Sequence, residues 1–195
     1  MILTELEAPA SLPIEVRALA DHLRLGTGFA DDGSEDALLE TLIRAATSAV
    51  EARIGKALIE RRLSWQLTRW QTAGAQGLPV APVAAIEAVR LIDAEGGAAD
   101  VPAATWRLEP DAHVPRLVGR SGGALPPVPV DGRVEIVLRA GFGPAPEDVP
   151  ADLRQAVTMV AAGYYEGRTE VGGALARPMP MGVSALLAPH RLMRV

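Results

Sequence analysis

The sequence contains no cysteine, so neither disulfide bonds nor thiolate chemistry can hold this protein together or drive a reaction. Lysine is also nearly absent: Lys56 is the only one among 19 basic residues, and the formal net charge is -5. Because affinity for nucleic-acid phosphates grows with clustered lysine and arginine, this balance argues against a DNA-binding face. Arginine can form forked contacts at an interface, but a GC-rich genome produces the same excess and is the preferred explanation.

Long apolar runs are missing too. No stretch approaches the roughly 18 apolar residues of a membrane span, and the N-terminus lacks a basic region followed by an apolar core. We therefore expect no membrane partner and a protein made in the bacterial cytoplasm. Hydrophobic residues nevertheless make up 49% and charged residues 22% of the 195 residues, which is typical of a globular domain, alone or with a sizeable insertion.

Residue patterns that support catalysis or metal binding are scarce. The histidines lie far apart and lack metal-ligand spacing: His22, His113 and His190. The segment around Ser184 lacks the second glycine of a nucleophile elbow, so a helix-initiating serine is the better interpretation. One acidic cluster suits a solvated loop and a helix start better than a calcium loop: Asp31, Asp32, Glu35 and Asp36. We expect no catalytic residue, no cofactor and no metal.

Helical periodicity occurs in three places. Residues 12–25 predict a first helix ended by Gly26, and a second, with Ser34 as its N-cap, is stopped by Gly55. The third helix, over 150–166, has the clearest period. We expect the second and third helices to pack through apolar positions that form a core or a subunit contact: Leu38, Leu42, Val50, Leu153, Val157, Val160 and Tyr164.

Alternation with a period of two replaces the helical period between these segments. Leu63, Trp65 and Leu67 share one face of a predicted strand, and residues 133–140 alternate in the same way. Two short strands, near 86–93 and 104–109, flank a turn at 93–97. This part should close as a small antiparallel sheet or sandwich.

The fold class that these patterns predict is α+β: a helical core of about three main helices, an inserted antiparallel β section and an extended C-terminal tail. The boundaries are 1–57 for the first part of the helical core, 58–147 for the β section, 148–168 for the last helix and 169–195 for a flexible strap and tail. Residues 186–195 are apolar and basic, carry no fold of their own, and need a surface on which to dock.

Several segments, in this order and spacing, resemble the head-tail connector, or adaptor, proteins of tailed phages, prophages and gene transfer agents, in the group of HK97-like connectors. The segments that carry the resemblance are Asp21-His22-Leu23-Arg24-Leu25, Glu35-Asp36-Ala37-Leu38-Leu39, Glu51-Ala52-Arg53-Ile54-Gly55-Lys56, Leu78-Pro79 with Pro82-Val83, Ala140-Gly141-Phe142-Gly143, Val149-Pro150-Ala151-Asp152-Leu153, Tyr164-Tyr165-Glu166-Gly167-Arg168 and Leu186-Leu187-Ala188-Pro189-His190-Arg191.

The resemblance implies structural work in a virion. Such connectors form a ring of about twelve copies between the portal and a tail-side stopper or tail terminator protein, at the head-tail junction, and leave a channel through which DNA passes without tight binding. In related connectors the C-terminal segment reaches the portal. That role carries over here to Leu186, Leu187, Pro189, His190, Arg191, Leu192, Met193, Arg194 and Val195.

Two other function classes remain open from the residues alone. A DNA-packaging or DNA-binding accessory factor would need a basic face, which the charge distribution does not suggest. A small hydrolase would need a convergent nucleophile, base and oxyanion donors, and the sequence shows no such set.

Overall fold

The computed structural model describes residues 1–25, 35–169 and 181–192, and it has the α+β architecture that the sequence predicts. The chain divides into two compact units. The β unit comprises residues 1–10 and 55–144, and the helical unit comprises residues 11–54 together with 145–195. The first ten residues therefore belong with the β section, whereas the sequence assigned them to the helical core.

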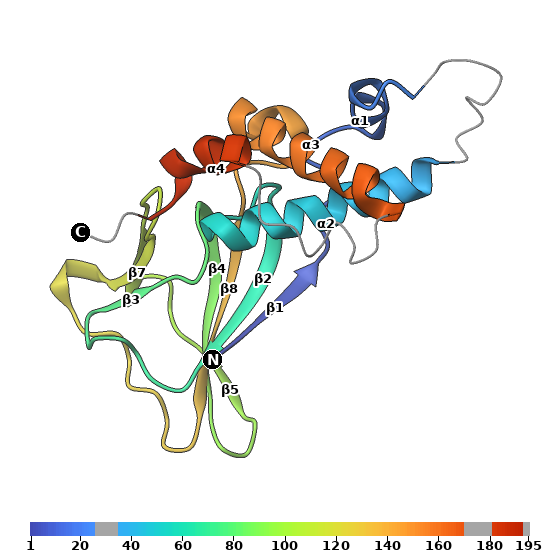
Figure 1. The fold of residues 1–195 in the computed structure, drawn as a ribbon. Coiled ribbons are helices and arrows are strands. Elements are labelled where there is room, and N and C mark those ends of the chain that lie inside the picture. The colour runs from blue at the N-terminus through green and yellow to red at the C-terminus, as the bar shows by residue number, and fades with distance from the viewer. Residues whose placement is uncertain (26–34, 170–180, 193–195) are drawn as a thin grey trace. The chain divides into compact units, whose positions relative to one another are not determined.

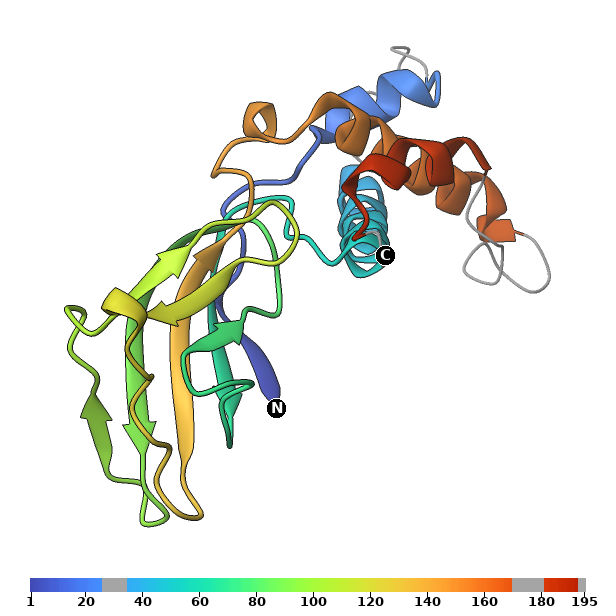
Figure 2. The same ribbon diagram turned by 90° about the vertical axis from the view of Figure 1, so that its left-hand side faces the viewer.

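The β unit contains two antiparallel sheets. A five-stranded sheet has the order β1-β2-β8-β4-β5, and a three-stranded sheet has the order β3-β7-β6. Figure 2 shows the strands of the smaller sheet lying over the larger one. The strand bounds are β1 Ile2–Glu7, β2 Arg61–Leu67, β3 Ala75–Gly77, β4 Val83–Ile92, β5 Ala98–Asp100, β6 Trp106–Glu109, β7 Arg116–Gly119 and β8 Arg133–Ala140.

One apolar core joins the two sheets. Leu63, Trp65 and Leu67 of β2 point into it, as their alternation predicts, and Trp106 and Leu117 enter it from the smaller sheet. Burial of these side chains is the main stabilising term for a sandwich of this kind. The other face of the large sheet is polar, and it carries ion pairs such as those of Arg62 with Glu7 and Glu87.

Three details of the sheet prediction were wrong. Strand β6, at 106–109, does not pair with β4, at 83–92, but with β7 of the smaller sheet. Across the turn at 93–97, β4 pairs with the short β5. Strand β1 was missed because all of its side chains are exposed, so its sequence lacks an alternating apolar pattern. Strands β3 and β7, of three and four residues, are too short to show a period.

The helical unit contains α1 (Val16–His22), α2 (Asp36–Ile54), α3 (Ala151–Glu166) and α4 (Met181–Leu187), with 3-10 turns η2 (Pro146–Asp148), η3 (Gly167–Thr169) and η5 (Ala188–His190). A further 3-10 turn, η1 (Arg120–Gly122), lies in the β unit. Helices α2 and α3 pack on each other, as predicted (Figure 1). Among the helices of the described ranges, none is both long and apolar enough to cross a membrane.

The buried face of α2 is displaced by one residue from the predicted stripe. Leu39 and Ile43 are buried, whereas Leu38 is 39% exposed and Leu42 is only half-buried. Apolar residues are adjacent at both places, so an i, i+4 period fits either choice. Val50 lies in the core as predicted. Leu38 therefore stays a candidate for a subunit contact only.

Helix α3 matches its prediction closely. Leu153, Val157 and Val160 are buried, and the helix starts directly after Pro150. Of the two adjacent tyrosines, Tyr165 is buried and Tyr164 is half-buried, again a displacement of one residue. Helix α1 is shorter than expected because Arg24, in a left-handed conformation with φ +56°, cannot continue a helix. Gly26 and Ser34 lie outside the described residues.

Lys56, the only lysine, is buried in the β unit at 5% exposure. Its Nζ donates a hydrogen bond to the carbonyl of Ala112 at 2.5 Å, and Asp111 supplies an opposing charge. Loss of hydration lowers the pKa of Lys56 below its usual 10.5, although the charge of Asp111 works in the other direction. Two backbone N–H groups, of Val114 and His113, lower the pKa of the Asp111 carboxyl.

This burial predicts a pH dependence of stability. Between the lowered pKa and 10.5, the unfolded chain holds a proton on Lys56 that the folded chain has released, so stability should rise with pH across that window. A Lys56→Gln variant should lack the rise. Urea unfolding followed by tryptophan fluorescence from pH 7 upward measures the difference, and equal pH slopes for the two proteins would contradict it.

Candidate docking site

Residues 181–190 form helix α4 and the turn η5, contrary to the prediction of an unstructured tail from residue 186. Helix α4 packs mainly on α3 and also touches α2 (Figure 1). Val183 and Leu187, four residues apart on one face of α4, are fully buried. Their burial fixes this short helix, which at seven residues would not be stable alone. Ser184 is the fourth residue of α4, so it does not initiate the helix.

A polar contact fixes the chain just after α4. His190 ends the turn η5, and its Nε2 lies 2.6 Å from Oδ2 of Asp152, in the first turn of α3. The other oxygen of Asp152 accepts a hydrogen bond from the backbone N–H of Leu153 at 2.9 Å. The carboxylate therefore has a set orientation, and it holds the imidazole directly before Arg191, the first residue after η5.

The predicted portal-binding residues differ in their exposure to solvent. Leu187 is a core residue, so its prediction as part of an exposed docking surface is wrong for this conformation. Leu186 and His190 are half-buried, while Pro189, Arg191 and Leu192 are exposed, with Leu192 at 55%. Met193, Arg194 and Val195 lie outside the described residues. Among these predicted residues, the exposed ones that the structure describes follow Leu187 in the chain.

A second polar cluster joins the start of α2 to the end of α3. The hydroxyl of Tyr165 donates to Oε2 of Glu35 at 2.8 Å, and the guanidinium of Arg168 lies 3.7 Å from the centre of the Tyr165 ring. The hydrogen bond to Glu35 and then burial raise the pKa of Tyr165, with Arg168 opposing them. Glu35 thus serves as a structural partner. No group of three histidine, aspartate or glutamate side chains suited to a metal occurs within the described ranges.

Comparison with known proteins identifies the family to which this chain belongs. A family model described as "Phage gp6-like head-tail connector protein" matches residues 21–96. A solved structure titled "Neck of empty GTA particle computed with C6 symmetry" contains a chain that is 48% identical, with a TM-score of 0.89, and the match covers 100% of this chain and 97% of that one. The chain belongs to the phage gp6-like head-tail connector family.

Two further structures resemble the connector over its whole length. A chain of "Virion of native gene transfer agent (GTA) particle" is 47% identical with a TM-score of 0.86, and one of "Neck of native GTA particle computed with C12 symmetry" is 43% identical with a TM-score of 0.84. Each match covers 100% of this chain and 97% of the other. No curated protein matched the sequence. The predicted family is confirmed, and the protein is a structural component of the head-tail junction.

Several residues that organise the docking segment of the connector were missed from its sequence. Nothing in the sequence around Asp152 pointed to His190, 38 residues away. Glu35 and Tyr165 are 130 residues apart. Such pairs appear only once the helices pack. The signal available in the sequence was the i, i+4 spacing of two apolar residues, Val183 and Leu187, which are both buried in the structure.

Proposed function

We propose that this connector forms a ring of about twelve copies between the portal and the tail-side proteins of a phage-like particle, with DNA passing through the ring. The observation that carries the proposal is the 48% identity, over the full chain, to a component of a particle neck. Related neck structures with C6 and C12 symmetry support a ring, because closed rotational symmetry repeats one head-to-tail contact.

The charge of the chain suits passage of DNA without tight binding. At -5 per subunit, a ring of about twelve copies carries a strongly negative charge, which repels phosphates. Many basic groups of the β unit are already paired with carboxylates, as Arg62 is with Glu7 and Glu87. The proposed role is structural and needs no catalytic group.

The proposed portal contact begins at Arg191. The Asp152–His190 contact and the buried Leu187 hold the preceding turn in place. Arg191 and the exposed Leu192 then extend from a fixed point, with a cation for portal carboxylates and an apolar side chain for a portal groove.

Substitution of Leu192 tests this contact without disturbing the core. Leu192→Asp should reduce attachment to purified portal by at least about tenfold, because it places a charge in an apolar contact. Met181→Asp is the matched control, since Met181 is also an exposed apolar residue, at 89%, on the same unit. Co-sedimentation with portal measures attachment. Equal attachment of both variants would remove Leu192 from the interface.

Microscopy of particles tests the ring itself. Cryo-electron microscopy of necks from cells that produce this connector should show its density as a closed ring directly below the portal. Density for this chain at any other place in the particle would overturn the proposed function.

A further inference from the structure

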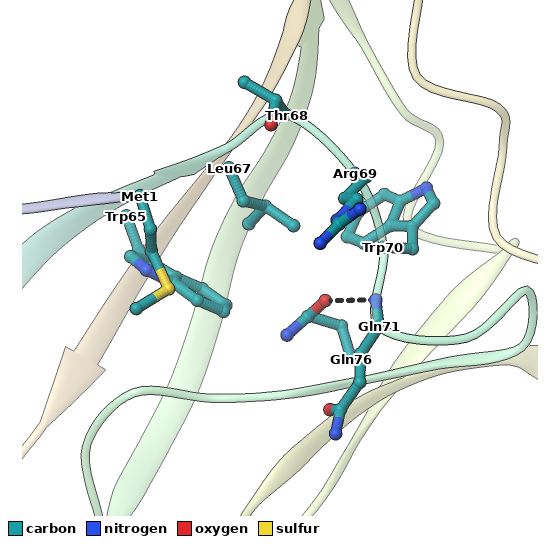
Figure 3. A pocket seen from close by; sticks show the side chains of 8 residues that line it. All are labelled: Met1, Trp65, Leu67, Thr68, Arg69, Trp70, Gln71 and Gln76. Carbon is teal, nitrogen blue, oxygen red and sulfur yellow. Dashed lines mark hydrogen bonds between the residues drawn. The ribbon is translucent and has the colours of Figure 1, made fainter.

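A pocket of about 630 Å³ opens at one end of the large sheet of the β unit. Its wall is formed by the end of β2 and the loop that follows, with Met1 at its side: Met1, Trp65, Leu67, Thr68, Arg69, Trp70, Gln71 and Gln76. Figure 3 shows Trp65 and Leu67 on one side of the open space and Arg69 on the other. The volume is large enough for the side chains of a protein turn.

Arg69 is the charged residue of this wall. The indole Nε1 of Trp65 has no hydrogen-bond partner, but it is closed off from solvent, and Trp65 as a whole is 2% exposed. Arg69 is exposed and forms no ion pair or side-chain hydrogen bond with any described residue. The side-chain oxygens of the two glutamines are already occupied, since Gln76 accepts from the N–H of Gln71 at 2.8 Å and Gln71 accepts from the N–H of Gly77 at 3.2 Å.

The pocket offers apolar surface from Leu67 and Trp70 together with the cation of Arg69. It therefore suits a ligand with an apolar side chain and a carboxylate. A protein turn that carries an exposed apolar residue next to an acidic one has this chemistry.

The same β unit presents such a turn. Gly132 donates its N–H to the carbonyl of Pro129 at 3.0 Å, which closes a turn with Val130 and Asp131 at its tip. Val130 is 88% exposed, and Asp131 is held at φ +54° with no side-chain partner among the described residues. The turn leads directly into β8, whose Val134 pairs with Leu67 of β2, so the turn and the pocket lie at the same end of the sheet.

The other exposed apolar residues of the β unit fit this pocket less well. Leu6 has acidic neighbours, but Glu5 and Glu7 are paired with Arg61 and Arg62. Val114 is also exposed, but the carboxylate nearest to it, that of Asp111, accepts two backbone hydrogen bonds. Within the described part of the β unit, the turn at Val130 is the exposed apolar site whose adjacent carboxylate is free.

We propose that the Pro129–Gly132 turn of one copy docks into the Trp65–Arg69 pocket of the next copy in the ring. Val130 enters the apolar part of the pocket, and Asp131 pairs with Arg69. This contact joins two different surfaces, as a head-to-tail ring requires. In a cyclic ring, neighbouring copies lie at the same height along the ring axis. The turn and the pocket lie at the same end of the sheet, so they meet between neighbouring copies when the strands run along that axis. The inference rests on the proposed ring.

Cysteine cross-linking tests the contact, and the cysteine-free sequence gives it a clean background. Particles are produced with a chain carrying both Arg69→Cys and Asp131→Cys, and the purified particles are oxidised. We expect a ladder of covalent multimers on a non-reducing gel, up to the closed ring. Each single substitution is the control and should give no species above a dimer. Particles that contain the double variant in their necks but yield only monomers would overturn the contact.

Absence of the unsubstituted chain from the neck would instead overturn the proposed function, so the two failures are distinguishable.

Charge exchange gives a second, independent test in the same cells. Arg69→Glu alone places a glutamate against Asp131 of the neighbouring copy, so it should lower the yield of particles at least about tenfold. Asp131→Lys alone places a lysine against Arg69 and should lower the yield by the same factor. Co-expression of the two variants should restore the yield, because a ring in which they alternate has opposite charges at every contact. If each variant alone assembled normally, or if co-expression failed to restore assembly, the pairing would be refuted.

Discussion

Replacement of Leu187 with alanine is expected to lower the free energy of unfolding of the helical unit by about 2–5 kcal/mol. Leu187 is 0% exposed, and truncation would leave a cavity where α4 packs on α3. All three tryptophans lie in the β unit, so far-UV circular dichroism is the appropriate probe of this transition. Leu186→Ala is the matched control, since Leu186 is the adjacent, half-buried leucine, and it should cost clearly less.

This result would separate two functions of the C-terminal segment. If Leu187 belonged to an exposed docking surface, its truncation would leave stability unchanged and weaken only portal attachment. A deletion from residue 186 onward would remove Leu187 and the His190–Asp152 contact together. Loss of attachment after such a deletion would therefore report damage to the helical unit, and point substitutions beyond His190 are the more informative test.

Replacement of Gly141 with alanine is expected to destabilise the β unit by about 3 kcal/mol or more. Gly141 follows β8 with φ +142°, a conformation that residues with a side chain rarely adopt. A Cβ atom there would lie 2.3 Å from the backbone nitrogen of Glu60 and 2.5 Å from the carbonyl carbon of Ile59. Both are backbone atoms, so relief would require the two segments to separate.

Gly55 offers the control for this substitution. It also has a positive φ, +69°, but a Cβ there would meet nothing within 4 Å. Gly55→Ala should therefore cost only about 1 kcal/mol, the usual penalty for a left-handed alanine. Denaturant unfolding followed by tryptophan fluorescence measures both variants. Equal losses at the two positions would show that the close approach to Glu60 contributes nothing.

The sequence predicted the elements that have strong periods and clear boundaries. Residues 133–140 and 150–166 were assigned as they occur, because the first alternates in a buried strand and the second follows Pro150 with a long apolar stripe. Where apolar residues are adjacent, as at Leu38 and Leu39, the period alone could not select the buried one. Tertiary packing made that selection.

The functional surfaces were harder to predict, and for a different reason. Helix α4 has only seven residues and is stabilised by packing, so its sequence resembled a free tail. Trp65 was expected in a core or an interface, and its apolar ring is indeed buried, but its unpaired N–H becomes visible only when every neighbouring acceptor is accounted for. Unsatisfied polar atoms are properties of a structure, and no residue pattern encodes them locally.

The division of the helical unit between two stretches of chain sets an order of events during synthesis. About 90 residues, 55–144, separate α2 from the segment that contains α3. At roughly 5 to 20 residues per second, α3 follows α2 from the ribosome on the order of 5 to 20 s later. All strands of the β unit have been made by then, since β8 ends at Ala140. Leu39 and Ile43 gain the cover of α3 only near the end of translation, so the β unit can form in the nascent chain and the helical unit is the last part of the connector to mature.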